Sequence, residues 1–314
     1  MKNIVSTINL PDEMIAGIKK VLPQANYEHV RSREMTAKER ERAEIFITYG
    51  TDMTEEHVSE FKNLKWIMVM SAGLEMMPLD KLEDVLITNA TGIHKIQMTE
   101  YTVGLILSHY KDFNLLYEDQ KAKHWREKAF TTELYGKCTH ILGTGSIGSH
   151  LAKVLQAFGV KTVGYNTNGR EVEGFDRTYP LEELMDHIDG ADILINILPS
   201  TKATVGLITE EHFEKMKSDS IFVNIGRGDI AKDEVLLNVL EEKQIGQLIL
   251  DVFNDEPLAP ESPFYKYDNV TITPHASSKT SGYIERAFEI FEHNLKHIDD
   301  YSKMENVIDS QRGY

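Results

Sequence analysis

The chain contains a single cysteine, Cys138, in 314 residues. One cysteine excludes an internal disulfide and a metal centre built from several thiolates. Cys138 stands at the start of an apolar run, where a thiol acts as a small hydrophobic side chain more often than as a nucleophile. We therefore expect neither a disulfide framework nor a metal site.

Long apolar runs are absent as well. No stretch of about 18 consecutive apolar residues occurs, which excludes a membrane-spanning helix of the usual length. The segment from Met1 to Pro11 also lacks the continuous apolar core of a secretory signal peptide. The sequence therefore predicts a cytoplasmic protein with no membrane partner.

Basic residues are few relative to acidic ones. The chain has 34 Lys and Arg against 50 Asp and Glu, for a net charge of -16. Such a charge repels a nucleic-acid backbone, so we expect no nucleic-acid partner. A small anionic substrate stays compatible with this balance when one or two arginines dominate its pocket.

The hydrophobic residues that are present follow two series of strand-like runs. With 41% hydrophobic residues, the chain can form two domain cores. In the first third of the chain, strand-like runs at 45–49, 66–70 and 85–88 alternate with a helical stretch at 55–64. A second series is stronger, with strands expected at 139–142, 162–165, 193–197, 221–225, 248–252 and 270–272. This βαβ alternation predicts parallel sheets covered by helices.

Apolar residues at helical spacing mark two further segments, at 98–115 and after Pro274. One arrangement of the final helix returns it to the first domain. The expected fold is therefore α/β, with two Rossmann- or flavodoxin-like domains, the second inserted into a discontinuous first domain. The first domain would comprise residues 1–98 and 280–314, and the second residues 99–279.

A glycine-rich turn follows the first strand of the second series. It has the pattern G-x-G-x-x-G and opens an amphipathic helix, with the residues Gly143, Thr144, Gly145, Ser146, Ile147 and Gly148. The first glycine permits a tight turn, the second lets backbone N–H groups approach a pyrophosphate, and the third allows close helix–strand packing. The helix N-terminus adds partial positive charge beside the phosphates. The turn therefore predicts a dinucleotide site.

The end of the next strand distinguishes between the two nicotinamide cofactors. A carboxylate about 20 residues after the glycines would bind the ribose hydroxyls of NAD, but here that position is Asn166. Asn166 does not repel a 2′-phosphate, and Asn168 and Arg170 carry donors for it. NADP(H) is therefore the favoured cofactor, with NAD(H) as the alternative.

Three polar residues follow later strands, at the edge where α/β sheets bind their ligands. Arg227 lies in "VNIGRGDI", Glu256 in "LDVFNDEPLAP" and His275 in "TITPHASS". Separately, each has an ordinary explanation, as a surface charge, a loop acid or a core histidine. Together they suit the reduction of a 2-oxo acid, because Arg227 can bind the carboxylate and polarise the carbonyl. His275 can then act as the acid/base, with Glu256 fixing its ring and favouring its protonated form.

The order and separation of these motifs resemble the D-isomer-specific 2-hydroxyacid dehydrogenases. Besides the glycine turn, the resemblance is carried by "LPSTKATVGLI", "FVNIGRGDI", "LDVFNDEPL" and "TPHAS", and it extends back to "LKWIMVMSAGLE". It implies an enzyme that transfers a hydride between NAD(P)H and a small 2-oxo acid to give the D-2-hydroxy acid. The catalytic trio would be Arg227, Glu256 and His275. Asn166 resembles NADP-preferring members of the glyoxylate/hydroxypyruvate reductase type.

The resemblance also implies that residues 1–98 and 280–314 form the substrate-binding domain, and that residues 99–279 form the dinucleotide-binding (Rossmann) domain inserted into it. Further contacts and a partner are implied as well. Backbone N–H groups of Ala72, Gly73 and Leu74 would bind the substrate carboxylate. The cofactor would also contact Leu198, Pro199, Ile225, Gly226, Asp251 and His275, with Asp251 accepting from the carboxamide. A homodimer is implied, through the long segment between the two strand series.

Two alternative functions share this scaffold. Formate dehydrogenases have Gln where this chain has Thr273 before Pro274 and His275, and they lack the Glu256 partner. A dinucleotide-sensing binding protein would retain the cofactor site, whereas an intact trio favours catalysis. Among substrates, glyoxylate, hydroxypyruvate, pyruvate and branched 2-oxo acids stay open.

Overall fold

The computed structural model of the protein describes residues 2–74, 77–129 and 131–308. The chain divides into two units: unit 1 comprises Met1–Ile93 and Thr280–Tyr314, and unit 2 comprises His94–Lys279. Each unit is an α/β structure built on one parallel sheet, so the predicted fold class is confirmed. Which unit binds substrate and which binds dinucleotide stays a prediction.

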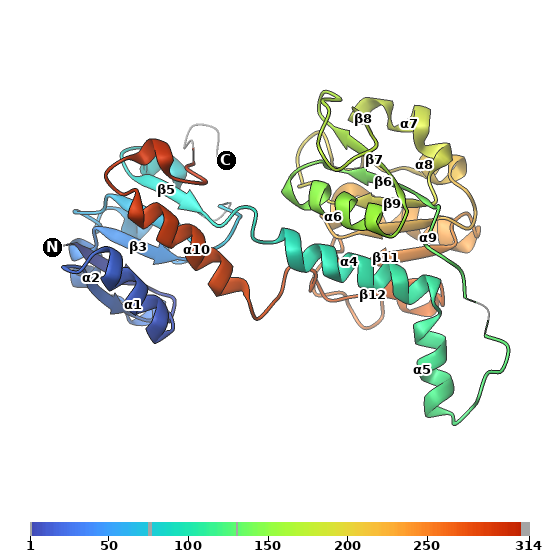
Figure 1. Cartoon of the computed structure of the whole chain (residues 1–314), viewed down its shortest axis with the longest axis horizontal. Helices are drawn as coiled ribbons and strands as arrows, with labels where there is room; N and C mark the ends of the chain where they lie inside the picture. Colours follow the sequence, from blue (N-terminus) through green and yellow to red (C-terminus); the bar gives the residue numbers. More distant parts are fainter. Residues whose placement is uncertain (1, 75–76, 130, 309–314) are drawn as a thin grey trace. The chain divides into compact units, whose positions relative to one another are not determined.

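Unit 1 has a five-stranded parallel sheet in the order β2-β1-β3-β4-β5 (Figure 1). Its strands are β1 (Asn3–Ser6), β2 (Asn26–His29), β3 (Ile45–Thr48), β4 (Trp66–Val69) and β5 (Leu86–Asn89). Its helices are α1 (Asp12–Val21), α2 (Ala37–Arg42), α3 (Glu55–Val58) and α10 (Tyr283–Lys296), with 3-10 helices at Ser32–Glu34, Leu79–Lys81 and Tyr301–Lys303.

Alternation along the strands of unit 1 separates two cores. Ile45 and Ile47 of β3 face one core, and Phe46 faces the other. The first core is closed by α1 and α10, whose Ile18 and Phe291 are fully buried. Since α10 lies beside α1 in Figure 1, segments from both ends of the sequence complete this core.

Unit 2 has a seven-stranded parallel sheet in the order β12-β11-β10-β9-β6-β7-β8 (Figure 1). Its strands are β6 (Cys138–Leu142), β7 (Lys161–Asn166), β8 (Arg177–Pro180), β9 (Ile193–Asn196), β10 (Ile221–Asn224), β11 (Gln247–Leu250) and β12 (Val270–Ile272). Its helices are α4 (Lys95–Tyr110), α5 (Phe113–Lys121), α6 (Ser146–Ala157), α7 (Leu184–His187), α8 (Glu210–Lys215) and α9 (Asp233–Glu241). Further 3-10 helices occur at Leu181–Glu183, Ile188–Gly190, Gly228–Ile230 and Pro263–Lys266.

The strand order of unit 2 reverses at β6, which pairs with β7 on one side and β9 on the other. Leu194 and Phe222 enter the core on one face of this sheet, while Ile195 and Val223 enter the core on the opposite face. Burial on both faces explains why these strands are almost continuously apolar. The carboxyl ends of β6 and β9 border the crevice where open α/β sheets bind ligands.

Two helices differ from the sequence prediction. The helix expected at 98–115 ends at Tyr110 and is followed by the separate helix α5, because Asp112 adopts a left-handed backbone with φ of 50°. The helix expected at 55–64 is limited to α3, since the chain turns to bury Phe61 in the core. A left-handed residue therefore ends the helical spacing at the first place, and side-chain burial overrides it at the second.

Three strands have no counterpart in the sequence prediction: β1, β2 and β8. Both β2 and β8 are edge strands with mixed sequences, NYEH and RTYP, and β8 ends in a proline. Edge strands tolerate polar residues and proline because one of their sides makes no ladder bonds. Four-residue runs of this kind have too little periodicity to predict a strand.

Two types of site are absent from the described part of the chain. None of its helices has the length and apolar character needed to cross a membrane. None of its His, Cys, Asp and Glu side chains form a group of three that could hold a metal ion. Cys138 is partly buried, and burial raises the pKa of its thiol, which disfavours the reactive thiolate.

His140 of β6 is a buried histidine whose pKa is lowered. Its exposed fraction is 2%, and its Nδ1 lies 2.9 Å from the hydroxyl of Tyr165 in β7. Burial, with a smaller effect of His187, lowers the pKa of His140 from 6.5 to about 4. The unfolded chain therefore takes up this proton at higher pH than the folded chain does.

Acidification is expected to destabilise unit 2 through His140. Neutral His140 makes its full contribution to stability above about pH 6.5, and this contribution is lost as the pH falls toward 4. At pH 5 the loss amounts to about 2 kcal/mol of unfolding free energy. Urea unfolding at about pH 7.5 and pH 5 measures this loss. Between these two pH values, the unfolding free energy of the double variant His140→Leu/Tyr165→Phe should fall by about 2 kcal/mol less than that of the control Tyr165→Phe, which retains the histidine. Equal losses in the two variants would contradict this origin.

Candidate active site

The glycine-rich turn joins β6 to α6 where the strand order reverses. Gly143 has a φ of 107°, a conformation that residues with a side chain rarely adopt. A Cβ on Gly148 would lie 2.0 Å from the carbonyl oxygen of Gly143, so only glycine allows α6 to start this close to the turn. A Cβ on Gly145 would meet no atom of the described residues within 4 Å. The turn thus has two tight positions and an open middle position, which fits a bound pyrophosphate.

A pocket of about 540 Å³ opens at this turn. Its lining residues are Gly143, Thr144, Gly145, Asn166, Thr167, Arg170, Leu181, Glu182, Leu198, Pro199, Thr201, Ala203, Thr204 and Leu207. The volume lies within the range of small-molecule sites. Several residues predicted to bind the cofactor therefore share one pocket, whereas Ser146, Ile147, Gly148 and Asn168 are not part of its lining.

Asn166 bonds within the protein and shapes the turn after β7. Its Nδ2 donates to the carbonyl of Arg170 at 2.9 Å and to Oγ1 of Thr144 at 3.2 Å. Its Oδ1 accepts from the N–H groups of Asn168 and Arg170, at 3.3 and 3.1 Å. The side chains of Asn168 and Arg170 are exposed. The amide of Asn166 therefore positions these two residues, while its own contact with a ribose stays a prediction.

Two buried asparagines shape the neighbouring strand ends. Asn196 ends β9, Asn224 ends β10, and Nδ2 of Asn196 donates to Oδ1 of Asn224 at 2.8 Å. The amides also bond the main chain of the following turns, at Leu198, Gly226 and Arg227. This pair was not predicted, although the recurrence of Asn at the end of two apolar strands, ILIN and IFVN, was a usable signal.

The turn after β10 carries two more predicted cofactor residues. Ile225 and Gly226 are both buried. A Cβ on Gly226 would lie 2.7 Å from both Nδ2 of Asn196 and the carbonyl oxygen of Leu198. Glycine is therefore required here by the packing of the two turns against each other. Contact of these residues with a nicotinamide stays a prediction.

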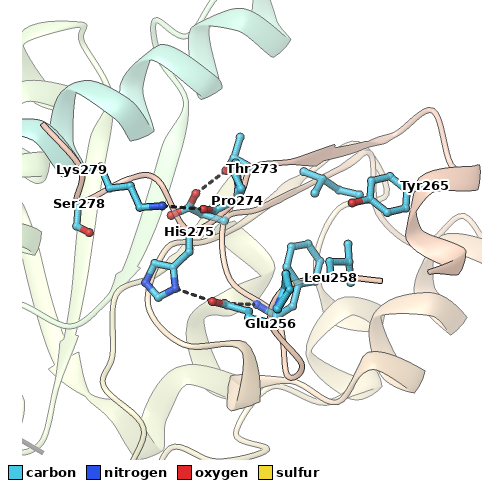
Figure 2. A pocket seen from close by; sticks show the side chains of 12 residues that line it. Glu256, Leu258, Tyr265, Thr273, Pro274, His275, Ser278 and Lys279 are labelled. Atoms are coloured by element: carbon cyan, nitrogen blue, oxygen red, sulfur yellow. Dashed lines mark hydrogen bonds and ion pairs between the residues drawn. The ribbon is translucent and has the colours of Figure 1, made fainter. Parts of the chain in front are cut away.

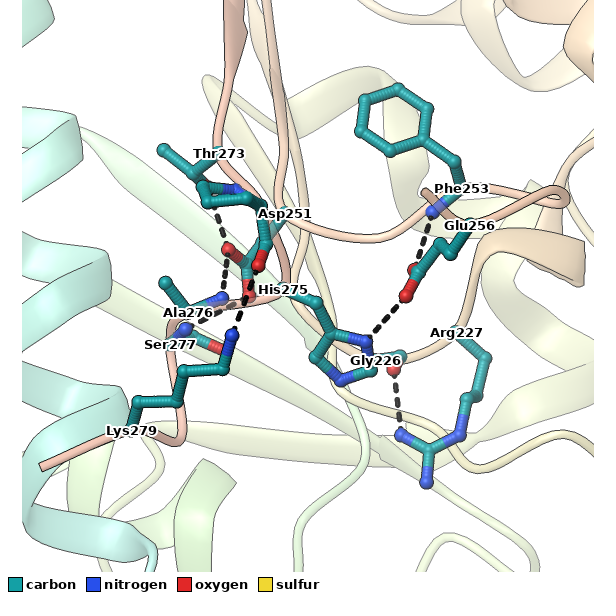
Figure 3. A network of polar contacts seen from close by, with 11 residues as sticks. Gly226, Arg227, Asp251, Phe253, Glu256, Thr273, His275, Ala276, Ser277 and Lys279 are labelled. Atoms are coloured by element: carbon teal, nitrogen blue, oxygen red, sulfur yellow. Dashed lines mark hydrogen bonds and ion pairs between the residues drawn. The ribbon is translucent and has the colours of Figure 1, made fainter. Parts of the chain in front are cut away.

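His275 and Glu256 contact each other in unit 2 (Figure 3). Nδ1 of His275 lies 2.7 Å from Oε2 of Glu256, and Oε1 of Glu256 accepts from the N–H of Phe253 at 3.0 Å. Both carboxylate oxygens and one ring nitrogen are thus held, which leaves Nε2 for a ligand. The side chain of His275 is 44% exposed, so a ligand can reach it.

Asp251 holds the segment that carries His275 (Figure 3). It is fully buried, and its carboxylate accepts from Thr273 Oγ1 at 2.6 Å and from the N–H groups of Ala276 and Ser277 at 2.8 and 2.9 Å. The N–H of His275 donates to the Asp251 carbonyl at 2.8 Å. These bonds stabilise the left-handed backbone of His275, whose φ is 49°. Acceptance from a cofactor carboxamide stays a prediction for Asp251.

Arg227, Glu256 and His275 line one pocket of about 280 Å³ in unit 2. Nη1 of Arg227 donates to the carbonyl of Gly226 at 2.9 Å, while the side chain as a whole is exposed (Figure 3). The structure therefore brings together a guanidinium, an imidazole and a carboxylate. A guanidinium can bind a carboxylate ligand, and an imidazole can exchange a proton with a nearby oxygen.

Glu256 and His275 also line a larger pocket, of about 590 Å³ (Figure 2). Its walls are mainly apolar and come from Phe253, Pro257, Leu258, Tyr265, Ile272 and Pro274. Polar groups are supplied by Asp251, Thr273, Ser278 and Lys279. The imidazole–carboxylate pair therefore faces an apolar pocket as well as the pocket that contains Arg227.

The residues predicted to bind the substrate carboxylate follow β4 in unit 1, and we call residues 71–74 the carboxylate loop. Ala72, Gly73 and Leu74 line a pocket of about 700 Å³ within unit 1. Gly73 is exposed, whereas Leu74 is buried. The binding role of this loop stays a prediction.

Comparison with known proteins identifies the family. Residues 103–277 match the sequence signature described as "D-isomer specific 2-hydroxyacid dehydrogenase, NAD binding domain". The chain is also similar to a protein named glyoxylate reductase from Thermofilum pendens. The two are 33% identical over 241 residues, which cover 74% of this chain and 71% of that protein.

Solved structures give the same result. A D-isomer specific 2-hydroxyacid dehydrogenase family protein from Aeromonas salmonicida has a TM-score of 0.85 and 30% identity, covering 98% of this chain and 99% of that one. An NADPH-dependent glyoxylate/hydroxypyruvate reductase from Sinorhizobium meliloti, solved with NADP and sulfate, has a TM-score of 0.78 and 25% identity over 100% of both chains. The resemblance drawn from the sequence motifs is confirmed, and the chain belongs to the D-isomer specific 2-hydroxyacid dehydrogenase family.

Proposed function

We infer that the protein reduces a small 2-oxo acid to the D-2-hydroxy acid with NADPH, and that Arg227, Glu256 and His275 are its catalytic residues. The observation that carries this proposal is that the three side chains line one pocket, with Nδ1 of His275 2.7 Å from Oε2 of Glu256. Family membership supports the reaction class.

His275 is assigned the proton transfer. A reduced nicotinamide supplies, when bound, the hydride that adds to the carbonyl carbon. The protonated ring of His275 gives its Nε2 proton to the carbonyl oxygen, which becomes the hydroxyl of the product. Glu256 keeps the other ring proton at Nδ1 and stabilises the positive charge that the ring carries before this transfer. The alcohol oxidation uses the same groups in reverse.

Arg227 and the carboxylate loop are assigned to substrate binding. The planar guanidinium of Arg227 forms paired hydrogen bonds to a carboxylate and polarises the adjacent carbonyl. The N–H groups of Ala72, Gly73 and Leu74 are donors of the type that binds a carboxylate oxygen. An anionic substrate thus has strong local donors although the chain carries a net charge of -16.

The glycine turn and the turn after β7 are assigned to NADP(H). The open position at Gly145 and the N-terminus of α6 suit the pyrophosphate. Asn168 and Arg170 are exposed donors for a 2′-phosphate. The reductase from Sinorhizobium meliloti was solved with NADP, which supports this preference. Leu198, Pro199, Ile225, Gly226 and Asp251 are assigned to the remaining cofactor contacts.

Replacing Asn166 with aspartate is expected to shift the cofactor preference toward NAD. A carboxylate at this position accepts from ribose hydroxyls and repels a 2′-phosphate. The ratio of kcat/KM for NADPH to kcat/KM for NADH should fall by about tenfold or more. Asn63→Asp, the same change at an exposed position of unit 1, is the control. An unchanged ratio in Asn166→Asp would remove the assignment of this strand end.

We also expect a homodimer. Phe113 and Tyr117 lie one turn apart on α5 with exposed fractions of 55% and 57%, and Trp125 in the following segment is 84% exposed. Apolar side chains concentrated in this way favour contact with another protein surface. Light scattering should give a particle of twice the 35.8 kDa chain mass.

The decisive test of the function is a matrix of cofactors against substrates. Absorbance of NADPH and of NADH is followed with glyoxylate, hydroxypyruvate, pyruvate and branched 2-oxo acids. Turnover with at least one pair supports the proposal. Binding of NADPH without turnover of any acid would instead favour a dinucleotide-sensing protein on the same scaffold.

A further inference from the structure

The carboxylate loop is anchored through three successive carbonyl groups. The carbonyl of Ser71 accepts from the N–H of Ala90 at 3.1 Å, and the carbonyl of Ala72 accepts from Nδ2 of Asn89 at 2.7 Å. The hydroxyl of Ser71 lies 3.1 Å from the carbonyl of Gly73 and 3.2 Å from that of Tyr49, so its one proton is shared between these two acceptors. All three peptide oxygens are thus directed at donors within unit 1.

This anchoring sets the direction of the N–H groups. In a planar trans peptide, the C=O and the N–H of the next residue point in opposite directions. The N–H groups of Ala72, Gly73 and Leu74 are therefore turned away from the donors that hold the carbonyls. Across residues 2–74, 77–129 and 131–308, no acceptor bonds these three N–H groups. They form a short row of donors that suits a carboxylate.

Asn89 is the buried side chain that fixes the middle carbonyl of the loop. It ends β5 and is 3% exposed. Its Nδ2 donates to Ala72, and its Oδ1 accepts from the N–H of Thr91 at 3.1 Å. Because one partner is a carbonyl and the other is an N–H, only one orientation of the amide satisfies both.

Asn306, near the end of the chain, holds Asn89 in turn. Its Nδ2 donates to the carbonyls of Asn89 and Thr91 at 3.1 and 2.8 Å, and its own carbonyl accepts from the N–H of Asn89 at 3.3 Å. An antiparallel bridge between Thr88 and Val307 extends this pairing along β5. The φ of Asn306 is 54°, a conformation that asparagine tolerates better than most residues.

We propose that Asn306 and Asn89 are positioning residues for substrate binding. Asn306 fixes the end of β5, Asn89 fixes the carbonyl of Ala72, and the loop thereby presents its N–H groups to the carboxylate of the 2-oxo acid. The identity of this ligand rests on the proposed function, whereas the clamp itself rests on the hydrogen bonds of unit 1. Because neither side chain is assigned to the reacting atoms, the clamp acts on substrate affinity rather than on the chemical step.

Two variants test the clamp in the full-length protein. Asn89→Asp keeps the size of the side chain but places an oxygen opposite the carbonyl of Ala72. Asn306→Gly retains the left-handed backbone and removes both donor bonds without adding charge. Asn63→Asp is the matched control, because Nδ2 of Asn63 also donates to a carbonyl in unit 1, that of Glu41 at 2.6 Å.

Steady-state kinetics with the best 2-oxo acid give the first readout. Both clamp variants should raise KM by about tenfold or more, with kcat within about twofold of the wild type and the Kd for NADPH unchanged. Asn63→Asp should behave as the wild type. Unchanged KM in both clamp variants, or a loss confined to kcat, would overturn the proposal.

Hydrogen exchange gives a second readout that needs no activity. The N–H of Ala90 is protected by the carbonyl of Ser71, so its exchange reports whether the loop is docked. We expect exchange at Ala90 to be about tenfold faster in Asn89→Asp and Asn306→Gly than in Asn63→Asp. Equal exchange in all three would refute the clamp. If the wild type reduces no 2-oxo acid, the proposed function fails, and this measurement still decides whether the clamp exists.

Discussion

Replacing His275 with alanine is expected to lower kcat for 2-oxo acid reduction by more than about 100-fold. The variant loses the group that gives a proton to the carbonyl oxygen. This oxygen therefore develops negative charge during reduction with no side chain to protonate it. Binding of NADPH should survive, because the glycine turn and its pocket do not include His275. Stopped-flow reduction and fluorescence titration of NADPH measure the two effects separately.

The control for this variant is His124→Ala, which removes an exposed histidine from the segment after α5. It should retain the wild-type rate. Because His275 has a left-handed backbone, a second variant, His275→Asn, places a residue there that tolerates this conformation. Near-normal turnover in either His275 variant would eliminate the assigned proton transfer.

Replacing Arg227 with lysine is expected to lower kcat/KM by about 100-fold even though the positive charge is kept. Arg227 already uses Nη1 to bond the carbonyl of Gly226, and its remaining N–H groups can still pair with both oxygens of a carboxylate. A lysine ammonium lacks this planar fork and cannot reproduce both sets of bonds in the same geometry. Rates at several concentrations of the 2-oxo acid separate the effects on kcat and KM.

Arg177→Lys serves as the control, since Arg177 is an exposed residue of β8 in the same unit. It should leave both kinetic constants unchanged. An Arg227→Lys enzyme with wild-type kcat and KM would show that the guanidinium has no special part in substrate binding.

Local sequence was sufficient to predict much of unit 2. Gly143 has the positive φ that the motif predicts, and Gly148 makes the close contact with the turn. Both requirements arise within six consecutive residues, so the local sequence reveals them. Glu256 and His275 lie close together because each follows one of two neighbouring strands, β11 and β12. Such juxtapositions follow from parallel topology once the strands are recognised.

Contacts that depend on the conformation of a single residue were not predictable. Apolar spacing runs on through Asp112, yet its left-handed backbone separates two helices. The four hydrogen bonds by which the amide of Asn166 shapes the turn after β7 were not predicted either, because they depend on how residues 166–170 fold back toward Thr144. The pairing of Asn306 with Asn89 joins positions 217 residues apart, which no local pattern reveals.

The packing of α10 against α1 has a consequence for the order of events during translation. Unit 2 is a continuous segment and holds all of its own strands, so it can fold once Lys279 has left the ribosome. Unit 1 must wait for the last helix, although most of its residues are made first. The nascent segment 1–93 therefore stays incomplete until α10 has been made, with the apolar face that α10 later covers accessible to chaperones.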